Sequence, residues 1–412
     1  MATRFTLIAL FCALSISAAE RELISWKRID LSTEFFAEGA GIGDFNKDGK
    51  TDVVYGPDWY EGPEFSKKHS VYPSKVFNPT KYSNNFITMV HDVNGDGYSD
   101  ILANVWPGKE VAWFENPKGQ DAEWKRHVAH ARVDGESPQL RDVSGDGKPD
   151  LVFHSGGILG FAEIAADPTQ PWTFVPVSDN GKWGRYQHGI GVGDVNGDGR
   201  IDMLLNSGWW EQPAEPIVPP ATWARHPAPF GAGGAQMYAY DVDGDGDNDV
   251  ITTLVAHGYG LAWFENKKGD DGAISFEEHL IIGGAESDSP YGVKFSQLHA
   301  LELIDINGDG LQDLVTGKRY WAHGPNGDVE PSAPAVVYWF QLTRSADGVE
   351  YIPHQIDNDS GVGTQIAVGD VNGDGHPDVV TGNKKGGYVH VQVRRKVGEA
   401  EWQDAQPKKR SE

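Results

Sequence analysis

The sequence is almost without cysteine: its 412 residues include a single one, Cys12. Disulfides stabilise many small exported domains, so an exported fold that lacks them needs another support, and bound metal ions can provide it. Residues 1–19 carry Arg4, an apolar run at residues 7–14 and small residues at their end. This order predicts a cleaved secretory signal peptide, which would remove Cys12, and a secreted or periplasmic location.

Positive charge and long apolar runs are scarce as well. The chain has 35 Lys and Arg against 60 Asp and Glu, which gives a formal net charge of −25 at pH 7. Proteins bind nucleic acids through basic patches, so this balance argues against such partners. Beyond residue 19, no stretch is apolar and long enough to cross a bilayer. We therefore expect no nucleic-acid partner and no membrane span.

Glycine, proline and aromatic residues are abundant by contrast. The sequence holds 51 Gly and 24 Pro, and 11% of its residues are aromatic. This composition predicts a folded, loop-rich chain rather than a helical bundle or a disordered segment. Single cores rarely grow beyond about 250–300 residues, so a chain of this length indicates several domains or a repeat architecture.

An acidic nine-residue motif that occurs seven times favours the repeat architecture. Its form is Asp-x-Asn/Asp/Ser-x-Asp-Gly-x-x-Asp, and successive copies start 47–65 residues apart. An apolar stretch precedes each copy and a short apolar run follows it, which is typical of a β-strand on either side of a loop. The copies occupy residues 44–52, 92–100, 142–150, 194–202, 241–249, 305–313 and 370–378.

The motif has the chemistry of a calcium site. Ca²⁺ takes six to eight oxygen ligands, and side chains at positions 1, 3 and 5 of a tight loop can converge on one ion. Glycine at position 6 permits the turn, the position-7 carbonyl adds a ligand and the position-9 aspartate closes the shell. An EF-hand would carry Glu at position 12, where three copies have Tyr55, Ala103 and Phe153. The sequence predicts up to seven Ca²⁺ sites, with copy three the weakest, and the predicted ligands are Asp44, Asn46, Asp48, Asp52, Asp92, Asn94, Asp96, Asp100, Asp142, Ser144, Asp146, Asp150, Asp194, Asn196, Asp198, Asp202, Asp241, Asp243, Asp245, Asp249, Asp305, Asn307, Asp309, Asp313, Asp370, Asn372, Asp374 and Asp378.

The segments after each loop predict the rest of the fold. They contain an aromatic strand, such as residues 113–116, and a fourth strand that often ends in His. Four antiparallel strands in about 50 residues are typical of a propeller blade. The last repeat has room for only two strands after its loop, and residues 24–31 look like the missing one. We therefore predict an all-β fold: a seven-bladed β-propeller of four-stranded antiparallel blades over residues 20–397, closed by the N-terminal strand pairing with the last blade, and a flexible tail over residues 398–412.

The loops resemble the FG-GAP and VCBS repeats of integrin α-chain propellers and of many secreted bacterial proteins, over about residues 24–394. The resemblance implies a calcium-binding propeller but leaves the activity open, because this repeat serves adhesion proteins, lectin-like modules and polysaccharide lyases. The chain is also similar to the propeller part of fungal aldos-2-ulose dehydratases, which eliminate water from keto-sugars. This second similarity lies in residues 188–194, 257–263 and 299–305.

A functional site is expected where the inner strands open at the mouth opposite the calcium loops. Residues about six before each loop and four to eight after it should meet there. They include acids, imidazoles, cations and aromatic rings, whereas a channel that only needs filling would use small apolar side chains, so we expect a ligand site. Candidate ligand-binding residues are Glu38, Glu136, His154, Trp106, Trp209, Asn206 and Lys384. Candidate catalytic residues are His188, His299, His257, Tyr320, Lys318 and Arg319.

Other aromatic and histidine residues recur at one position of the repeat and are expected to be structural. The recurring tryptophans should pack between blades, and the recurring histidines should end the fourth strands. These residues are Trp113, Trp263, Trp339, His127, His226, His279 and His354. His188, His257 and His299 do not recur in this way, which is why they are candidates.

Two functions from different classes remain open. As a binding module, the funnel would hold a glycan or a protein ligand, because aromatic faces stack on sugars while polar side chains bond hydroxyls and carboxylates. As an enzyme, the protein would be a lyase or dehydratase on a uronic or keto sugar: a His or Tyr320 would remove the proton next to a carbonyl, and Lys318 or Arg319 would stabilise the enolate. The three candidate histidines could also hold Zn²⁺ or another transition metal. The binding module is our first prediction and the lyase its alternative, with the oligomeric state open.

Overall fold

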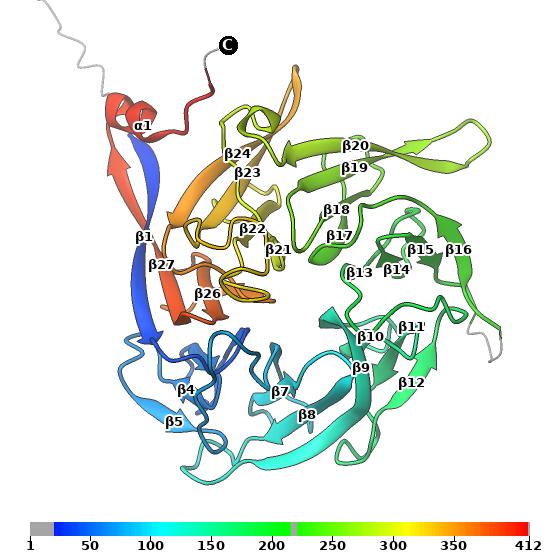
Figure 1. The fold of residues 1–412 in the computed structure, drawn as a ribbon, viewed down its shortest axis with the longest axis vertical. Helices are drawn as coiled ribbons and strands as arrows, with labels where there is room; N and C mark the ends of the chain where they lie inside the picture. The colour runs from blue at the N-terminus through cyan, green and yellow to red at the C-terminus, as the bar shows by residue number, and fades with distance from the viewer. Residues whose placement is uncertain (1–19, 216–220, 411–412) are drawn as a thin grey trace, which may run out of the picture.

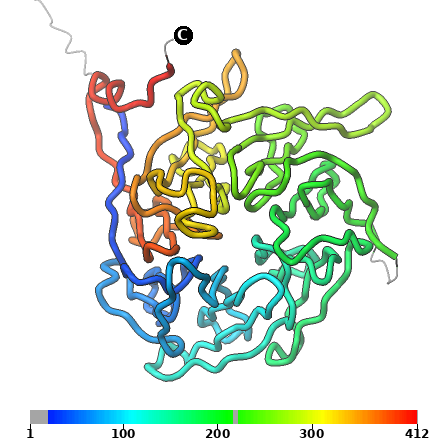
Figure 2. Tube along the Cα trace, in the orientation of Figure 1, coloured from blue at the N-terminus to red at the C-terminus, as the bar shows by residue number. Residues whose placement is uncertain are grey.

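A computed structural model describes residues 20–215 and 221–410, so the predicted signal peptide lies outside the described residues. This part of the chain is all-β, with 27 strands, the short 3-10 helix η1 (Glu286–Asp288) and the helix α1 (Glu399–Ala405). The chain travels once around a central axis, as Figure 1 and Figure 2 show. No helix in residues 20–215 or 221–410 is long and apolar enough to cross a membrane. The fold is propeller-like, as predicted.

Seven repeat units follow one another around the axis, each built on one acidic loop. The loop joins the first strand of its unit to the second, as the flanking apolar residues predict. Units 1 to 7 begin at β2, β6, the end of β9, β13, β17, β21 and β25. In chain order the strands are β1 (Arg21–Ser32), β2 (Ala40–Gly43), β3 (Asp52–Tyr55), β4 (Asp58–Tyr60), β5 (Lys68–Ser70), β6 (Ile87–His91), β7 (Asp100–Asn104), β8 (Lys109–Glu115), β9 (Lys125–Arg141), β10 (Asp150–Ser155), β11 (Ile158–Glu163), β12 (Thr173–Pro176), β13 (Ile190–Gly193), β14 (Asp202–Leu205), β15 (Gly208–Glu211), β16 (Ala224–Pro227), β17 (Gln236–Tyr240), β18 (Asp249–Thr253), β19 (Leu261–Lys268), β20 (Ile274–Ile282), β21 (Leu301–Ile304), β22 (Asp313–Gly317), β23 (Val337–Ser345), β24 (Gly348–Asp357), β25 (Ile366–Gly369), β26 (Asp378–Asn383) and β27 (Gly386–Val397).

The prediction of seven separate four-stranded blades is not confirmed in that form. Three units form four-stranded sheets, but the others merge into one seven-stranded sheet, β6 to β12, and one eight-stranded sheet, β13 to β20. The first merger arises because β9 is 17 residues long and pairs with both β8 and β10. The second arises because β13 and β17 pair in parallel over a few residues. Pairing that involves the inner strands therefore joins two neighbouring units into one sheet in each case.

The first and last strands of the described chain lie side by side. β1 pairs with β27 in antiparallel register, from Arg21 opposite Val397 to Ser32 opposite Gly387. β1 forms the outer edge of the sheet β1-β27-β26-β25. From the end of β1 the chain enters the first unit and begins its course around the axis (Figure 1). The segment after β27, which we expected to be a flexible tail, holds α1, and Trp402 of this helix lies under the Arg21 guanidinium. The mobility of this segment stays a prediction.

A stacked Trp–His pair recurs on the outer strands. Trp113 of β8 stands opposite His127 of β9, with ring centroids 4.6 Å apart, and the His127 Nε2 atom lies 3.0 Å from Glu115 Oε2. The same stack places Trp209 against His226 in unit 4, at 4.1 Å. Trp209 is therefore a packing residue, and its predicted place in the funnel is wrong: Trp209 lies on the third strand of its unit, beside the fourth. The stacked pairs are Trp59–His69, Trp113–His127, Trp209–His226, Trp263–His279 and Trp339–His354.

Side-chain amides also fasten one unit to the loop of the unit before it. Asn116, at the end of the third strand in unit 2, donates its Nδ2–H to the carbonyl oxygen of Phe45 in the first loop, at 2.9 Å. Asn266 does the same to Val195, at 3.1 Å. These bonds satisfy carbonyl groups that are buried between units. The acidic loops are thereby tied into the wall of the ring.

Candidate functional site

Each acidic loop is shaped by hydrogen bonds between its acidic side chains and its own backbone. In the first loop, Asp44 Oδ2 accepts the N–H of Gly49 at 3.0 Å, and Asn46 Oδ1 accepts the N–H of Asp48 at 2.9 Å. The glycines at position 6 have φ from 81° to 97°, which favours glycine, as predicted. Position 4 is left-handed too: it is glycine in six copies and Lys47, with φ of 60°, in the first. This second constraint is visible in the sequence as the repeated Gly before the position-5 aspartate.

The last aspartate of each loop is buried and has a structural role as well as its predicted role as a ligand. Asp100 Oδ2 accepts the N–H of Val93 at 2.9 Å, and its Oδ1 accepts the N–H of Asn116 at 2.7 Å. The carboxylate thus joins the start of the loop to the end of the third strand. Burial, with smaller contributions from Asp92 and Asp96, raises the pKa of Asp100 to about 7. A carboxylate in this setting is costly to keep ionised without a nearby cation.

The oxygens of the fifth loop come close enough together to share an ion. Oxygens of Asp241, Asp243 and Asp249 lie within 4.8 Å of one another. Ca²⁺–oxygen distances of about 2.3–2.6 Å allow oxygens that far apart to bind one ion. The donor set of this loop, carboxylates and a backbone carbonyl, suits a hard cation.

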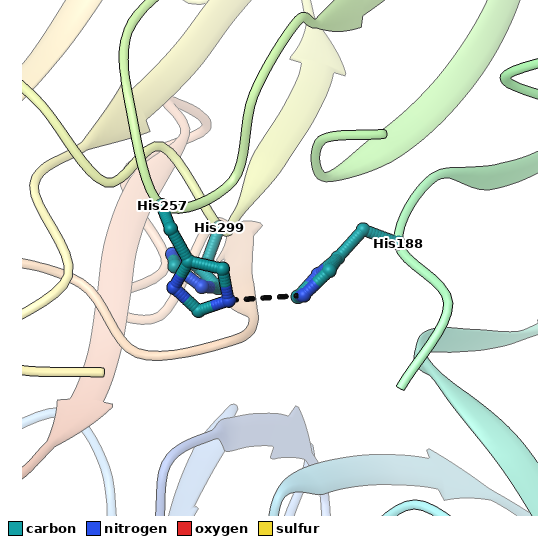
Figure 3. A group of neighbouring side chains, drawn as sticks. All are labelled: His188, His257 and His299. Atoms are coloured by element: carbon teal, nitrogen blue, oxygen red, sulfur yellow. Dashed lines mark hydrogen bonds between the residues drawn. The ribbon is translucent and has the colours of Figure 1, made fainter. Parts of the chain in front are cut away.

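At the ends of the inner strands opposite the acidic loops, three histidines from separate segments meet. His188 stands before β13, His257 follows β18 and His299 stands before β21. The Nε2 atoms of His188 and His257 are 3.2 Å apart, and one ligand nitrogen from each of the three rings lies within 4.8 Å of the others. Figure 3 shows the three rings turned toward one another, with the dashed line joining His257 and His188. The structure thus brings together the three histidines that the sequence singled out.

The electrostatics of this trio leave lone pairs available. Burial lowers the pKa of His188 to about 4 and holds that of His299 well below its ordinary value, so both rings are neutral at pH 7. The Nδ1 atom of His299 lies 3.2 Å from the carbonyl oxygen of Gln297, which accepts the hydrogen of that nitrogen. The buried Nε2 atom of His299 has no hydrogen-bond partner among the described residues. Three imidazole nitrogens that face one another form a donor set that Zn²⁺ takes.

A buried ion triad crosses the channel next to the trio. Arg319 of unit 6 donates from Nε to Glu38 Oε2 at 3.0 Å and from Nη1 to Glu136 Oε2 at 3.2 Å. Glu38 precedes β2, and Glu136 lies in β9 on the other side of the axis. Because both carboxylates already bind the guanidinium, Arg319 holds the channel together in this arrangement. The predicted contact of Arg319 with a substrate enolate is not favoured, since the group has no free edge.

The two candidate lysines are buried beside this triad. Lys318 Nζ donates to Ser296 Oγ at 2.8 Å, and Lys384 Nζ donates to the carbonyl oxygen of Ala322 at 3.2 Å. Burial lowers the pKa of each ammonium group to about 8. Tyr320 is half-buried and stacks on Trp321, with centroids 4.6 Å apart. A lysine near its pKa at neutral pH can hold or release a proton.

The remaining candidates take three different places. His154 is buried, opposite Asp134 in the β9–β10 pair, and burial lowers its pKa to about 4. Asn206 Oδ1 accepts a hydrogen bond from Gln187 Nε2 at 3.0 Å. Trp106 stands in an aromatic row, with ring centroids 6.1 Å from Tyr82 and 6.4 Å from Tyr186.

Sequence reasoning missed a set of glutamines in the channel. Gln365 accepts the N–H of Thr88 at 2.8 Å and donates to its carbonyl oxygen at 2.7 Å, which clamps unit 7 to unit 2. Gln236 and Gln139 bridge other inner strands and, with Gln365 and Glu302, line a cavity of about 350 Å³. These glutamines replace hydrogen bonds that neighbouring inner strands do not make. Their signal in the sequence is weak: Gln236 and Gln365 both stand five residues before their loops, but no other unit has Gln there, and Gln139 stands three residues before its loop.

Sequence reasoning also missed Asp328 and His323, which lie beside the trio. Asp328 Oδ1 is 2.7 Å from His323 Nδ1 and 3.5 Å from His257 Nδ1. The centroid of the His323 ring is 4.4 Å from that of His257. Neither residue lies in the repeat motif or at a predicted distance from a loop, so only the folded chain shows that they adjoin the site.

Comparisons with known proteins give one family and a group of solved structures. The FG-GAP-like repeat family matches residues 92–153 and 305–381. Among solved structures, rhamnogalacturonan lyase YesW is 13% identical, with a TM-score of 0.43, over 90% of this chain and 72% of that one. The exotype rhamnogalacturonan lyase YesX is 12% identical, with a TM-score of 0.42 and the same coverage.

A third structure and the curated proteins complete these comparisons. The biofilm matrix protein Bap1 of V. cholerae is 19% identical, with a TM-score of 0.35, over 71% of this chain and 42% of that one. No curated protein matches the chain significantly. The motif, the strands around it and the family match agree: the chain carries FG-GAP-like repeats in a propeller-like, all-β fold.

Proposed function

We propose that the protein is a secreted or periplasmic seven-bladed propeller, closed by β1 in its last blade, that binds calcium in its acidic loops. The pairing of β1 with β27 supports the closure, and it would leave no unpaired strand at the junction. The seven loop sequences and their left-handed glycines support the calcium sites, as do the three carboxylates of the fifth loop that lie within 4.8 Å of one another. Each bound ion would compensate the buried position-9 aspartate and lock its loop.

We further propose that the funnel is the active site of a metal-assisted carbon–oxygen lyase acting on uronic or keto sugars. The observation that carries this is the trio His188, His257 and His299, whose ligand nitrogens lie within 4.8 Å of one another. The separation of 3.2 Å between two Nε2 atoms is close to the edge of about 3.3 Å that a zinc tetrahedron has with bonds of 2.0–2.1 Å. A mere binding module would not require three imidazoles to face one another.

Each group of funnel residues would have its own role in the elimination. A zinc ion in the trio would polarise the carbonyl or carboxylate next to the carbon that loses its proton. Lys384 and Lys318, whose pKa values burial lowers to about 8, would hold or supply protons near that oxygen. Trp106 and its aromatic neighbours would stack on the sugar ring. The ion triad of Arg319 would keep the funnel in shape.

The alternative is a module that binds a glycan or a protein ligand without chemistry. Zinc content and lyase activity separate the two functions. The protein, purified without chelator, is assayed for bound zinc and incubated with uronic-acid polysaccharides and keto sugars while the ultraviolet absorbance of an unsaturated product is followed. We expect one zinc per chain and turnover of at least one substrate.

A matched pair of variants gives the control. His188→Ala should abolish both zinc binding and turnover, whereas His226→Ala, which removes a stacked histidine on the outer strands, should leave both unchanged. Glycan binding with neither zinc nor product would show that the funnel is a binding module instead. Zinc retained in full by His188→Ala would remove this residue from the site.

A further inference from the structure

The carboxylate of Asp328 faces the rings of two histidines. Its side chain is 1% exposed, and its Oδ2 atom accepts the backbone N–H of His323 at 2.6 Å. Its Oδ1 atom lies 2.7 Å from Nδ1 of His323 and 3.5 Å from Nδ1 of His257. Asp328 therefore accepts a hydrogen bond from the His323 ring and faces the more distant Nδ1 atom of His257.

This contact has a different consequence for each ring. In His257, a hydrogen held on Nδ1 leaves the Nε2 lone pair pointing at His188, where the proposed metal would bind. In His323, the hydrogen on Nδ1 leaves Nε2 as a free base on the far side of the ring. The His323 side chain is 48% exposed, whereas that of His188 is 14% exposed. His323 thus stands at the open side of the cluster, where a substrate can reach it.

We propose that His323 is the general base of the lyase and that Asp328 is the residue that positions it, an inference that rests on the proposed function. His323 Nε2 takes the proton from the carbon next to the carbonyl or carboxylate of the sugar. The electron pair of that C–H bond forms the C=C bond, and the C–O bond at the next carbon breaks. The departing oxygen takes up the proton from His323, so the base is regenerated and the net reaction is an elimination.

The geometry explains why the base is a separate histidine. The three rings of the trio use their lone pairs toward one another, so none of them is free to accept a proton from carbon. His323 adjoins the trio, with its ring centroid 4.4 Å from that of His257, but it is held by Asp328 outside the trio. A base fixed by a buried carboxylate next to an electrophilic site is the arrangement that proton abstraction requires.

Three variants of the full-length protein test this. His323→Gln should lower kcat by about 100-fold to 10,000-fold with little change in KM, while zinc content and melting temperature stay at the wild-type level. In deuterium oxide, this variant should also stop exchanging the substrate proton next to the carbonyl. Asp328→Asn should lower kcat and also weaken zinc affinity by about 10-fold to 100-fold, because it disturbs both imidazoles. Asp328→Glu should restore part of the kcat.

His226→Gln is the matched control, because His226 also pairs with a carboxylate, that of Glu211, at 2.9 Å, but on the outer strands. It should change none of these quantities. If wild-type protein turns over substrate and His323→Gln keeps full kcat and proton exchange, the inference is wrong while the proposed function stands. If wild-type protein binds no zinc and eliminates nothing, both are wrong. If His323→Gln only lowers the melting temperature, the pair is a structural contact.

Discussion

The two mouths of the channel are built on opposite principles. At one mouth, the acidic loops repeat the same carboxylates and glycines seven times. At the other, His188 and His299 stand six residues before their loops, where the other five units carry other residues, and His257 and His323 occupy positions that are not His in any other unit. Repetition suits a stabilising role, since each unit needs the same support. A reactive site needs different groups at one point, which a repeat can supply only where its copies diverge.

Chelation should produce the largest effect and separate the two mouths. EGTA, which prefers calcium, should lower the melting temperature strongly, because each saturated loop contributes about 2.7 kcal/mol when calcium exceeds its dissociation constant a hundredfold. A zinc-selective chelator should abolish turnover with little change in melting. Differential scanning calorimetry with each chelator measures this. Equal melting temperatures with and without EGTA would show that calcium in the loops does not stabilise the fold.

The buried ion triad is expected to give the next largest effect. Arg319→Met leaves Glu38 and Glu136 buried without their partner, which should cost about 3–5 kcal/mol in the free energy of unfolding. Adding Glu38→Gln and Glu136→Gln to this variant should restore much of the loss, because no buried charge remains. Urea unfolding of the variants provides the measurement. A loss below about 1 kcal/mol would mean that water reaches the triad.

Lys384 should make stability depend on pH. Burial lowers its pKa from 10.5 to about 8, so between pH 8 and 10.5 the unfolded chain binds more protons than the folded one. The free energy of unfolding should therefore rise with pH across this window, by about 3 kcal/mol. Lys384→Met should remove this contribution and leave the similar one of Lys318, whose pKa burial also lowers to about 8. Lys385→Met, at the more exposed neighbouring residue, should retain both. An identical slope in Lys384→Met would assign the effect to another group.

The smallest effect is expected between units. Asn116→Ala removes the hydrogen bond to Phe45 and leaves a buried carbonyl without its donor, at a cost of about 1–3 kcal/mol. Zinc binding and turnover should not change, because the bond lies on the loop side of the wall. Urea unfolding together with the lyase assay distinguishes the two. A loss of turnover would show that the two mouths are coupled through the wall.

The features of the fold that could be predicted from the sequence are those that a local, repeated pattern encodes. The loops, the strands on either side of them and the stacked histidines were predicted because each is encoded within one repeat and recurs. Trp209 was misplaced because counting residues from a loop does not show on which strand of the unit a residue lies. The merging of units was missed because it depends on the length of β9 and on the close approach of β13 to β17.

The funnel was predicted in part. His188, His257 and His299 stood out because they break the repeat, and the fold brings them together. Arg319 was predicted to face a substrate, but its charge is taken up by Glu38 and Glu136, which are 281 and 183 residues away in sequence. Asp328 and His323 were not predicted, since a short-range pair in an irregular segment carries no pattern.

The sequence by itself determined the all-β, FG-GAP-like repeat character of the protein and the positions of its acidic loops, because backbone turns and strand periodicity are local properties. Only the tertiary structure decided which side chains share the channel. Wrapping the units around one axis brings together residues that are far apart in the chain. The ion pairs and hydrogen bonds that those residues form with one another then decide which side chains remain free to react.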